Sequence, residues 1–157
     1  MLGADNGMTE LDLVAEMTEA FEQPIRFVPD PTVDERLLRL NMLQEELNEL
    51  GAAVSAKYDY SAYPEGEWVH DPDGSYDTVE MVDALVDIEV IHKGNILTFG
   101  ATVIFDEAFD IVHGSNMAKL VDGKLVRRAD GKILKPEGWV APTAQIKALV
   151  EKAMENG

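Results

Sequence analysis

Carboxylates in two parts of this sequence have the spacing of metal ligands. The first group lies among leucines and comprises Glu45, Glu46 and Glu49. The second group lies in an otherwise apolar stretch and comprises Glu80, Asp83 and Asp87. Residues three or four positions apart share one face of a helix, so each group places acids on one side of a helical segment. Such a face can present several oxygen atoms to one cation.

Acidic side chains that interrupt apolar stripes are unfavourable unless something neutralises them. Like charges a few ångströms apart raise each other's pKa, and an unpaired buried carboxylate is costly. Nearby cations are few: Arg36 and Arg39 precede the first group, and His92 and Lys93 follow the second. A divalent cation would remove the conflict, and an all-oxygen ligand set favours Mg²⁺, with Mn²⁺ as the alternative. The competing interpretation is that both groups lie on solvated helix faces.

A basic segment stands out in an acidic chain. The formal net charge is −17, yet six of the 13 Lys and Arg residues lie between positions 119 and 135. They are Lys119, Lys124, Arg127, Arg128, Lys132 and Lys135. Because such side chains bind phosphate oxygens, the metal ligands and the basic segment together predict a polyphosphate substrate. The alternative is a loop whose charges only balance the acidic chain.

Capping signals and hydrophobic periodicity predict the helices that carry these groups. Thr9 with Asp12, and Thr32 with Glu35, have the pattern of capping boxes at helix starts. The first predicted helix begins at residue 9 and ends before Pro24. The others cover residues 33–56, about 76–99, about 102–116, and the chain from residue 142 onward.

The helices predict the fold class. The second helix carries an apolar stripe that we expect to be buried, the leucine stripe, formed by Leu40, Leu43, Leu47, Leu50 and Val54. Residues 58–75 are predicted to be an aromatic-rich loop, and two Asp-Gly dipeptides in the basic segment predict tight turns. We therefore expect one all-α domain over residues 1–157, a four- to five-helix bundle with a C-terminal irregular or hairpin loop.

Composition excludes several functional classes. Cysteine is absent, which excludes disulfides, thiolate metal sites and cysteine nucleophiles. The acidic charge argues against nucleic acid or an anionic membrane surface as a partner. The first residues lack the features of a signal peptide and no apolar run is long enough to span a bilayer, so we expect a cytoplasmic protein.

Four segments in order resemble one enzyme family. Residues 44–50 (QEELNEL) resemble the E-E-x-x-E motif of the MazG-like, all-α nucleoside triphosphate pyrophosphohydrolases, and residues 82–87 are similar to the second metal helix of that family. Residues 112–119 are similar to its N-x-x-K segment. Residues 127–139 resemble the C-terminal loop of the dUTPase-like MazG branch, which includes phage and bacterial members. The resemblance covers about residues 10–142 and identifies the chain as a candidate member.

The resemblance implies Mg²⁺-dependent hydrolysis of a (deoxy)nucleoside triphosphate to monophosphate and pyrophosphate, with dUTP favoured and a role in cleansing the nucleotide pool. It implies a metal site formed by Glu45, Glu46, Glu49, Asp83 and Asp87, with Glu46 and Glu49 as the catalytic residues that generate the attacking nucleophile. The implied substrate contacts are Asn116 and Lys119 for the nucleotide and Arg128, Lys132 and Lys135 for the phosphates. It also implies a homodimer or homotetramer.

The second metal motif departs from the family pattern, which is E-x-x-D. With Asp87 as its aspartate, the glutamate position is occupied by Ala84; in the other register the motif is Glu80 with Asp83. Two other functional classes stay open. The strings Glu89-x-x-His92 and Asp110-x-x-His113 are weakly similar to the ligands of di-iron bundles. An acidic helical adaptor without catalysis is the non-enzymatic alternative.

Overall fold

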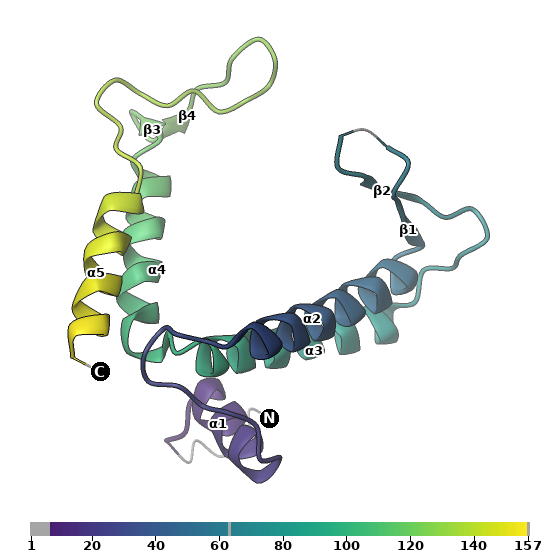
Figure 1. Cartoon of the computed structure of the whole chain (residues 1–157). Helices are drawn as coiled ribbons and strands as arrows, with labels where there is room; N and C mark the ends of the chain where they lie inside the picture. The colour runs from purple at the N-terminus through teal and green to yellow at the C-terminus, as the bar shows by residue number, and fades with distance from the viewer. Residues whose placement is uncertain (1–6, 63, 157) are drawn as a thin grey trace. The chain divides into compact units, whose positions relative to one another are not determined.

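The computed structural model describes residues 7–62 and 64–156, which form five helices and two small antiparallel sheets (Figure 1). The helices are α1 (Glu10–Ala20), α2 (Val33–Ala53), α3 (Thr78–Thr98), α4 (Thr102–Met117) and α5 (Thr143–Glu155). The strand pairs are β1 (Ala56–Asp59) with β2 (Glu67–His70), and β3 (Leu120–Val121) with β4 (Lys124–Leu125). Two compact units result: α1, α2, β1, β2 and α3 form the first, and Phe27–Pro29 with the chain from Gly100 onward forms the second.

The predicted predominance of helix is confirmed, but a purely all-α fold is wrong. Most of the predicted aromatic loop is the hairpin β1–β2, in which Ala56 pairs with His70. Ser55 has a φ of 58°, and α2 ends at Ala53 rather than at the predicted residue 56. Tyr63, in the connection between the two strands, lies outside the described residues. A local backbone reversal and the pairing of distant residues therefore replace the predicted last helical turn.

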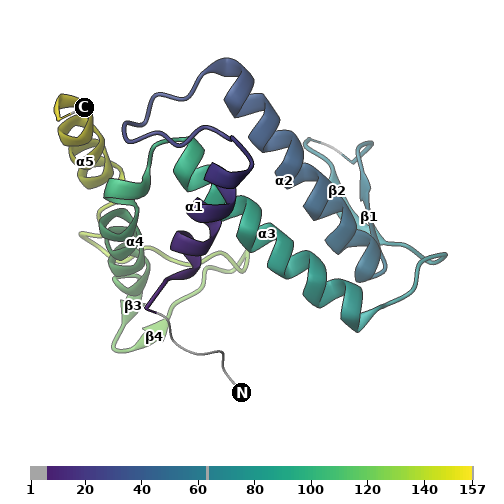
Figure 2. The ribbon, with the colours of Figure 1, turned by 90° about the horizontal axis from the view of Figure 1, so that it is seen from below.

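The long helices of the first unit, α2 and α3, run antiparallel and side by side (Figure 2). The backbone N–H of Asp77, which caps α3, donates to the carbonyl of Ala53 at the end of α2 at 2.8 Å. At the other end, Arg39 Nη2 donates to the Ile91 carbonyl at 2.7 Å, and Arg39 Nε donates to Asn95 Oδ1 at 2.7 Å. These contacts place the middle of α2 beside the middle of α3, where the two predicted carboxylate groups occur.

Arg39 takes the place in the helix interface that the leucine stripe was expected to have. Its side chain is 4% exposed, whereas Leu40 is 55% exposed and Leu47 is 36% exposed. Gly94 makes room for the guanidinium, because a Cβ at that position would overlap it. Burial lowers the pKa of Arg39 from its ordinary value. The prediction that the leucine stripe is buried is therefore wrong within the single chain at Leu40, Leu47 and Val54.

The remaining helix and the hairpin of the first unit pack on this pair. Helix α1 contacts α3 and buries Val14 and Thr18, and the predicted capping box at its start is confirmed. Trp68 of β2 lies against Gly51 of α2, where a Cβ would overlap the indole ring. The ring of Tyr58 meets that of Trp68 edge to face, with centroids 5.4 Å apart. The aromatic side chains thus anchor the hairpin to the end of α2.

The second unit pairs α4 with α5 and carries the basic segment (Figure 1). Asp122 and Gly123 join β3 to β4 with φ values of 50° and 74°, as a tight hairpin turn requires. A second reversal, closed by a bridge between Arg127 and Ile133, has Gly131 at φ 81°. Both predicted Asp-Gly turns are confirmed. In the described parts of both units, no helix combines the length and apolar character needed to cross a membrane.

Candidate functional site

The carboxylates predicted as metal ligands come together around Glu46. We call Glu45, Glu46, Glu49, Asp83 and Asp87 the carboxylate cluster. Glu46 is half-buried, and its Oε2 atom is buried without a hydrogen-bond partner in the described structure. Burial raises the pKa of Glu46 above its ordinary value of 4.5, and the negative charges of the other four members raise it further. Two of those four belong to α3, so the charges of both helices act on one half-buried carboxylate.

The carboxylate cluster has the donor chemistry that a hard divalent cation needs. It supplies only oxygen atoms, and none of its members forms an ion pair with a described Lys, Arg or His. Among the residues that the structure describes, no three Asp, Glu, His or Cys side chains converge closely enough to form a ready-made coordination shell. The side chains match Mg²⁺ in charge and in ligand type, but in the described structure they are not arranged as a coordination shell.

The two registers of the second metal motif place their residues at different positions along α3. Asp83 and Asp87 act on Glu46 through their charges, whereas Ala84, at the glutamate position of one register, is 4% exposed. Glu80 lines a hollow of about 520 Å³ together with Glu49 at the end of α2. The acids of α3 thus approach α2 at two neighbouring places.

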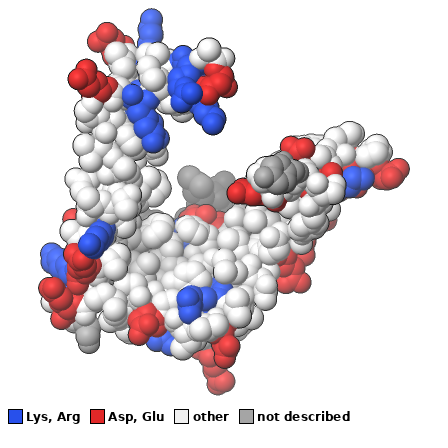
Figure 3. Space-filling model, turned by 45° about the horizontal axis from the view of Figure 1, so that its top comes forward, with Lys and Arg blue, Asp and Glu red and all other residues white. Residues whose placement is uncertain are grey.

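The predicted substrate-binding residues lie in two places within the second unit. Lys119 and Lys135 place their Nζ atoms 5.5 and 4.4 Å from the centroid of the Trp139 ring. Lys119 Nζ also donates to Asn116 Oδ1 at 2.8 Å. Lys119 and Lys135 therefore meet at one indole ring, and Asn116 is joined to them through Lys119. Space-filling Figure 3 shows Lys and Arg side chains gathered over the part of this unit that carries β3 and β4.

The other two predicted residues lie in the reversal that follows β4. Arg128 Nη2 forms an ion pair with Asp130 Oδ2 at 3.2 Å, and both side chains are exposed. The backbone N–H of Lys132 donates to Asp130 Oδ1 at 3.1 Å, while the Lys132 side chain has no partner in the described structure. Asp130 is only two residues from Arg128 along the chain. The ion pair is solvated, so the guanidinium stays accessible to an anion.

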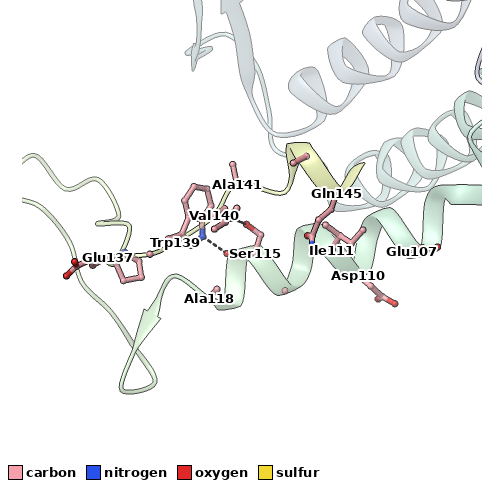
Figure 4. Close-up of a pocket in the computed structure, with 14 residues that line it drawn as sticks. Glu107, Asp110, Ile111, Ser115, Ala118, Glu137, Trp139, Val140, Ala141 and Gln145 are labelled. Carbon is pink, nitrogen blue, oxygen red and sulfur yellow. Dashed lines mark hydrogen bonds between the residues drawn. The ribbon is translucent and has the colours of Figure 1, made fainter. Parts of the chain in front are cut away.

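Trp139 is the residue of this region whose role sequence reasoning missed. Figure 4 shows its indole beside α4, in a hollow of about 820 Å³ lined by α4, α5 and residues 136–141. Trp139 Nε1 donates to the Ser115 carbonyl at 2.8 Å, and Ser115 Oγ donates to the Val140 carbonyl at 3.3 Å. Pro136 and Gly138, two residues typical of turns, are the sequence signal that could have drawn attention to Trp139. In the structure they form a turn, in which Gly138 has a φ of 78° and the backbone N–H of Trp139 donates to the Pro136 carbonyl.

The ligand strings of a di-iron site are not brought together within either unit. Glu89 Oε1 forms an ion pair with Lys93 Nζ at 2.7 Å, and this contact lowers the pKa of Glu89. The string of Asp110 and His113 belongs to α4 in the second unit.

Comparison with protein-family models matches no family, and comparison with curated proteins matches no relative. The motif resemblance and the geometry of the two units are therefore the basis for a functional proposal.

Proposed function

We propose that the protein is a Mg²⁺-dependent nucleoside triphosphate pyrophosphohydrolase that releases pyrophosphate and a nucleoside monophosphate. The observation that carries the proposal is Glu46, a half-buried carboxylate with an unpartnered oxygen and a raised pKa among four other acids from two helices. Carboxylates with perturbed pKa values cluster at functional sites, and a bound cation would relieve their mutual repulsion. The four motif segments, in the order typical of the family, support the same conclusion.

In this proposal the carboxylate cluster holds Mg²⁺, with Mn²⁺ as the alternative. The bound ion would lower the pKa of a water molecule and neutralise charge on the phosphates. Glu46 and Glu49 are the groups that accept the proton of the attacking water. Substitution of either glutamate by glutamine removes the proton acceptor as well as ligand charge.

The basic residues of the second unit would bind the phosphates. Lys119 and Lys135, with Arg128 and Lys132 from the following reversal, would offset negative charge that builds on the departing pyrophosphate. Asn116 would contact the nucleotide. The resemblance of residues 127–139 to the dUTPase-like branch supports dUTP as the favoured substrate and a cytoplasmic role in cleansing the nucleotide pool.

Self-association is part of the proposal, as a homodimer or homotetramer. Large apolar side chains on both long helices are exposed in the single chain, including Leu37, Leu38, Leu40, Val82 and Val86, each at least 50% exposed. Exposed apolar patches of this kind mark interaction surfaces in proteins that bind partners. Sedimentation velocity measures the assembly directly, and a monomer at micromolar concentration would contradict this part of the proposal.

The decisive experiment is a screen of nucleoside triphosphates with Mg²⁺, in which pyrophosphate and monophosphate are measured separately. We expect both products in equal amounts, dUTP turned over fastest, and no turnover in EDTA. Asp87→Asn is expected to fold normally and to lose nearly all turnover, because it removes charge from the carboxylate cluster. Glu16→Gln, on the exposed side of α1, is the matched control and should keep the parent rate.

Two outcomes would overturn the proposal. If the only products were orthophosphate and a nucleoside diphosphate, the bond cleaved would be the one between the β- and γ-phosphates. A chain that neither binds Mg²⁺ by isothermal titration nor hydrolyses any triphosphate would be the acidic adaptor instead.

A further inference from the structure

The indole of Trp139 attaches the chain beyond the basic segment to the end of α4. Its Nε1–H donates to the Ser115 carbonyl at 2.8 Å, one of the last carbonyls of α4, which α-helical bonding leaves without a partner. Ser115 Oγ returns a hydrogen bond to the carbonyl of Val140, the residue after Trp139. Figure 4 draws both contacts as dashed lines between the helix and the extended chain. The indole ring is therefore held at a defined place on α4.

Two cations from different parts of the chain lie over this ring. Lys119 follows α4 directly, and Lys135 comes 16 residues later, with their Nζ atoms 5.5 and 4.4 Å from the ring centroid. Both distances fall within the range of cation–π attraction. Neither ammonium forms an ion pair with a carboxylate of the described residues, although the chain has 30 acidic residues. Two like charges held at one ring repel each other, and an anion would relieve that repulsion.

We propose that Trp139 is a positioning residue that assembles Lys119, Lys135 and Asn116 into a binding site for phosphate oxygens. The Asn116 side-chain oxygen accepts from Lys119 Nζ at 2.8 Å, which leaves the amide N–H groups to donate to an anion. Each ammonium group has three N–H donors, and the described structure uses only one of them, in the bond from Lys119 to Asn116. The ligand class is a polyphosphate, whose adjacent oxygens can engage two ammonium groups and an amide at once.

The ring contributes by fixing the lysine side chains before the ligand arrives. A lysine loses much rotamer freedom when it binds an anion, and a contact that already restricts the side chain reduces that loss. The chain as a whole has a net charge of −17 and repels anions, so a local convergence of cations is needed to hold one. As the phosphate-binding part of a nucleotide site, this inference rests on the proposed function, but anion binding can be measured without any hydrolysis.

The experiment measures binding of inorganic tripolyphosphate to the full chain in EDTA at low ionic strength. The chain has two tryptophans, so a Trp68→Phe variant leaves Trp139 as the only indole, and its emission reports the ring directly. We expect a saturable change in this emission. Lys119→Met and Lys135→Met keep an aliphatic chain over the ring and should each weaken binding about tenfold. Trp139→Leu and Trp139→Phe lack this emission, so isothermal titration calorimetry measures the affinity of the parent and of every variant. Trp139→Leu should weaken binding roughly three- to tenfold and Trp139→Phe less, because Phe keeps the ring face but loses the Ser115 bond.

Matched variants separate positioning from net charge. Lys147→Met removes one positive charge from α5 of the same unit, where Lys147 pairs with Glu151, and should leave tripolyphosphate affinity unchanged. In the Trp139→Leu background, Lys135→Met should cost less than it does in the parent, since its ammonium is no longer positioned. Circular dichroism checks that each variant is folded, and if Trp139→Leu is not, the comparison of Trp139→Phe with the lysine variants decides.

The outcomes distinguish this inference from the proposed function. Tripolyphosphate binding that depends on Trp139 and the lysines supports the site, even if no triphosphate is hydrolysed. If Trp139→Leu and Trp139→Phe bind tripolyphosphate as the parent does, the positioning role is overturned, whatever the hydrolytic activity. An equal loss of affinity in Lys147→Met and Lys135→Met would overturn it too, because binding would then follow overall charge alone.

Discussion

Replacing Glu46 by glutamine is expected to change stability in opposite directions without and with Mg²⁺. Burial and the neighbouring acids hold the pKa of Glu46 above 4.5 in the folded protein. The folded state therefore favours the protonated carboxyl group, so the full stability is present below pH 4.5 and falls as the pH rises through the raised pKa. In EDTA at pH 8, Glu46→Gln should melt at a higher temperature than the parent. At pH 4 the variant should show no such gain.

Mg²⁺ should reverse the order of the two proteins. A ligand present at about 100 times its Kd stabilises the folded state by about 2.7 kcal/mol. For a chain of 157 residues, each kcal/mol raises the melting temperature by roughly 2–4 °C, so the parent should gain about 5–11 °C. Losing one carboxylate from the cluster should weaken Mg²⁺ binding about 10- to 100-fold. At the same Mg²⁺ concentration the variant then gains only about 0.4–1.4 kcal/mol, or roughly 1–6 °C.

The assay is thermal unfolding at matched Mg²⁺ and EDTA concentrations. Trp68 emission in a Trp139→Phe background reports the first unit, where the carboxylate cluster lies. Glu16→Gln should keep the parent's Mg²⁺ shift, because it makes the same chemical change outside the cluster. A full Mg²⁺ shift in Glu46→Gln would refute its assignment as a ligand. A lower melting temperature than the parent in EDTA at pH 8 would refute the argument from repulsion and burial.

Two further predictions concern the packing and the pH response of the first unit. Gly94→Ala should destabilise the protein by about 1–3 kcal/mol in urea, because the added methyl group would overlap the Arg39 guanidinium. Its control, Gly114→Ala, enters open space on α4 and should stabilise by up to about 1 kcal/mol; equal effects would contradict the packing argument. The ion pair with Arg26 lowers the pKa of Glu35 to about 2, so its contribution is present above pH 4.5 and lost as the pH falls towards 2. Glu35→Gln should accordingly melt below the parent at pH 7, with the difference shrinking between pH 4.5 and pH 2; a constant difference would contradict the assignment.

Local signals in the sequence were sufficient for the helices. The capping boxes at Thr9 and Thr32 are confirmed, and both involve residues only three positions apart. The turn at Asp122 and Gly123 is confirmed for the same reason, since two adjacent residues with positive φ are enough to form it. Periodicity also placed the acids of each helix on one face, because that depends only on helical geometry.

The structure was needed wherever partners are distant in the sequence. The hairpin β1–β2 was missed because strand pairing and the packing of Trp68 against Gly51, 17 residues away, are not local features of the sequence. The burial of Arg39 in place of Leu40 was missed because periodicity ranks side chains by hydrophobicity. Periodicity does not predict that the Arg39 guanidinium donates to Asn95 on another helix, or that Gly94 leaves space for it.

The candidate sites divide in the same way. The sequence by itself determined that two helices carry acids at ligand spacing and that a basic segment follows them. Only the tertiary structure decided that charges from both helices act on the buried oxygen of Glu46, and that Lys119 and Lys135 share the ring of Trp139. The physical reason is the separation along the chain of the residues that interact. Capping, turns and helical faces depend on neighbours within a few residues, whereas burial, electrostatic coupling and cation–π contacts depend on which distant side chains the packing brings together.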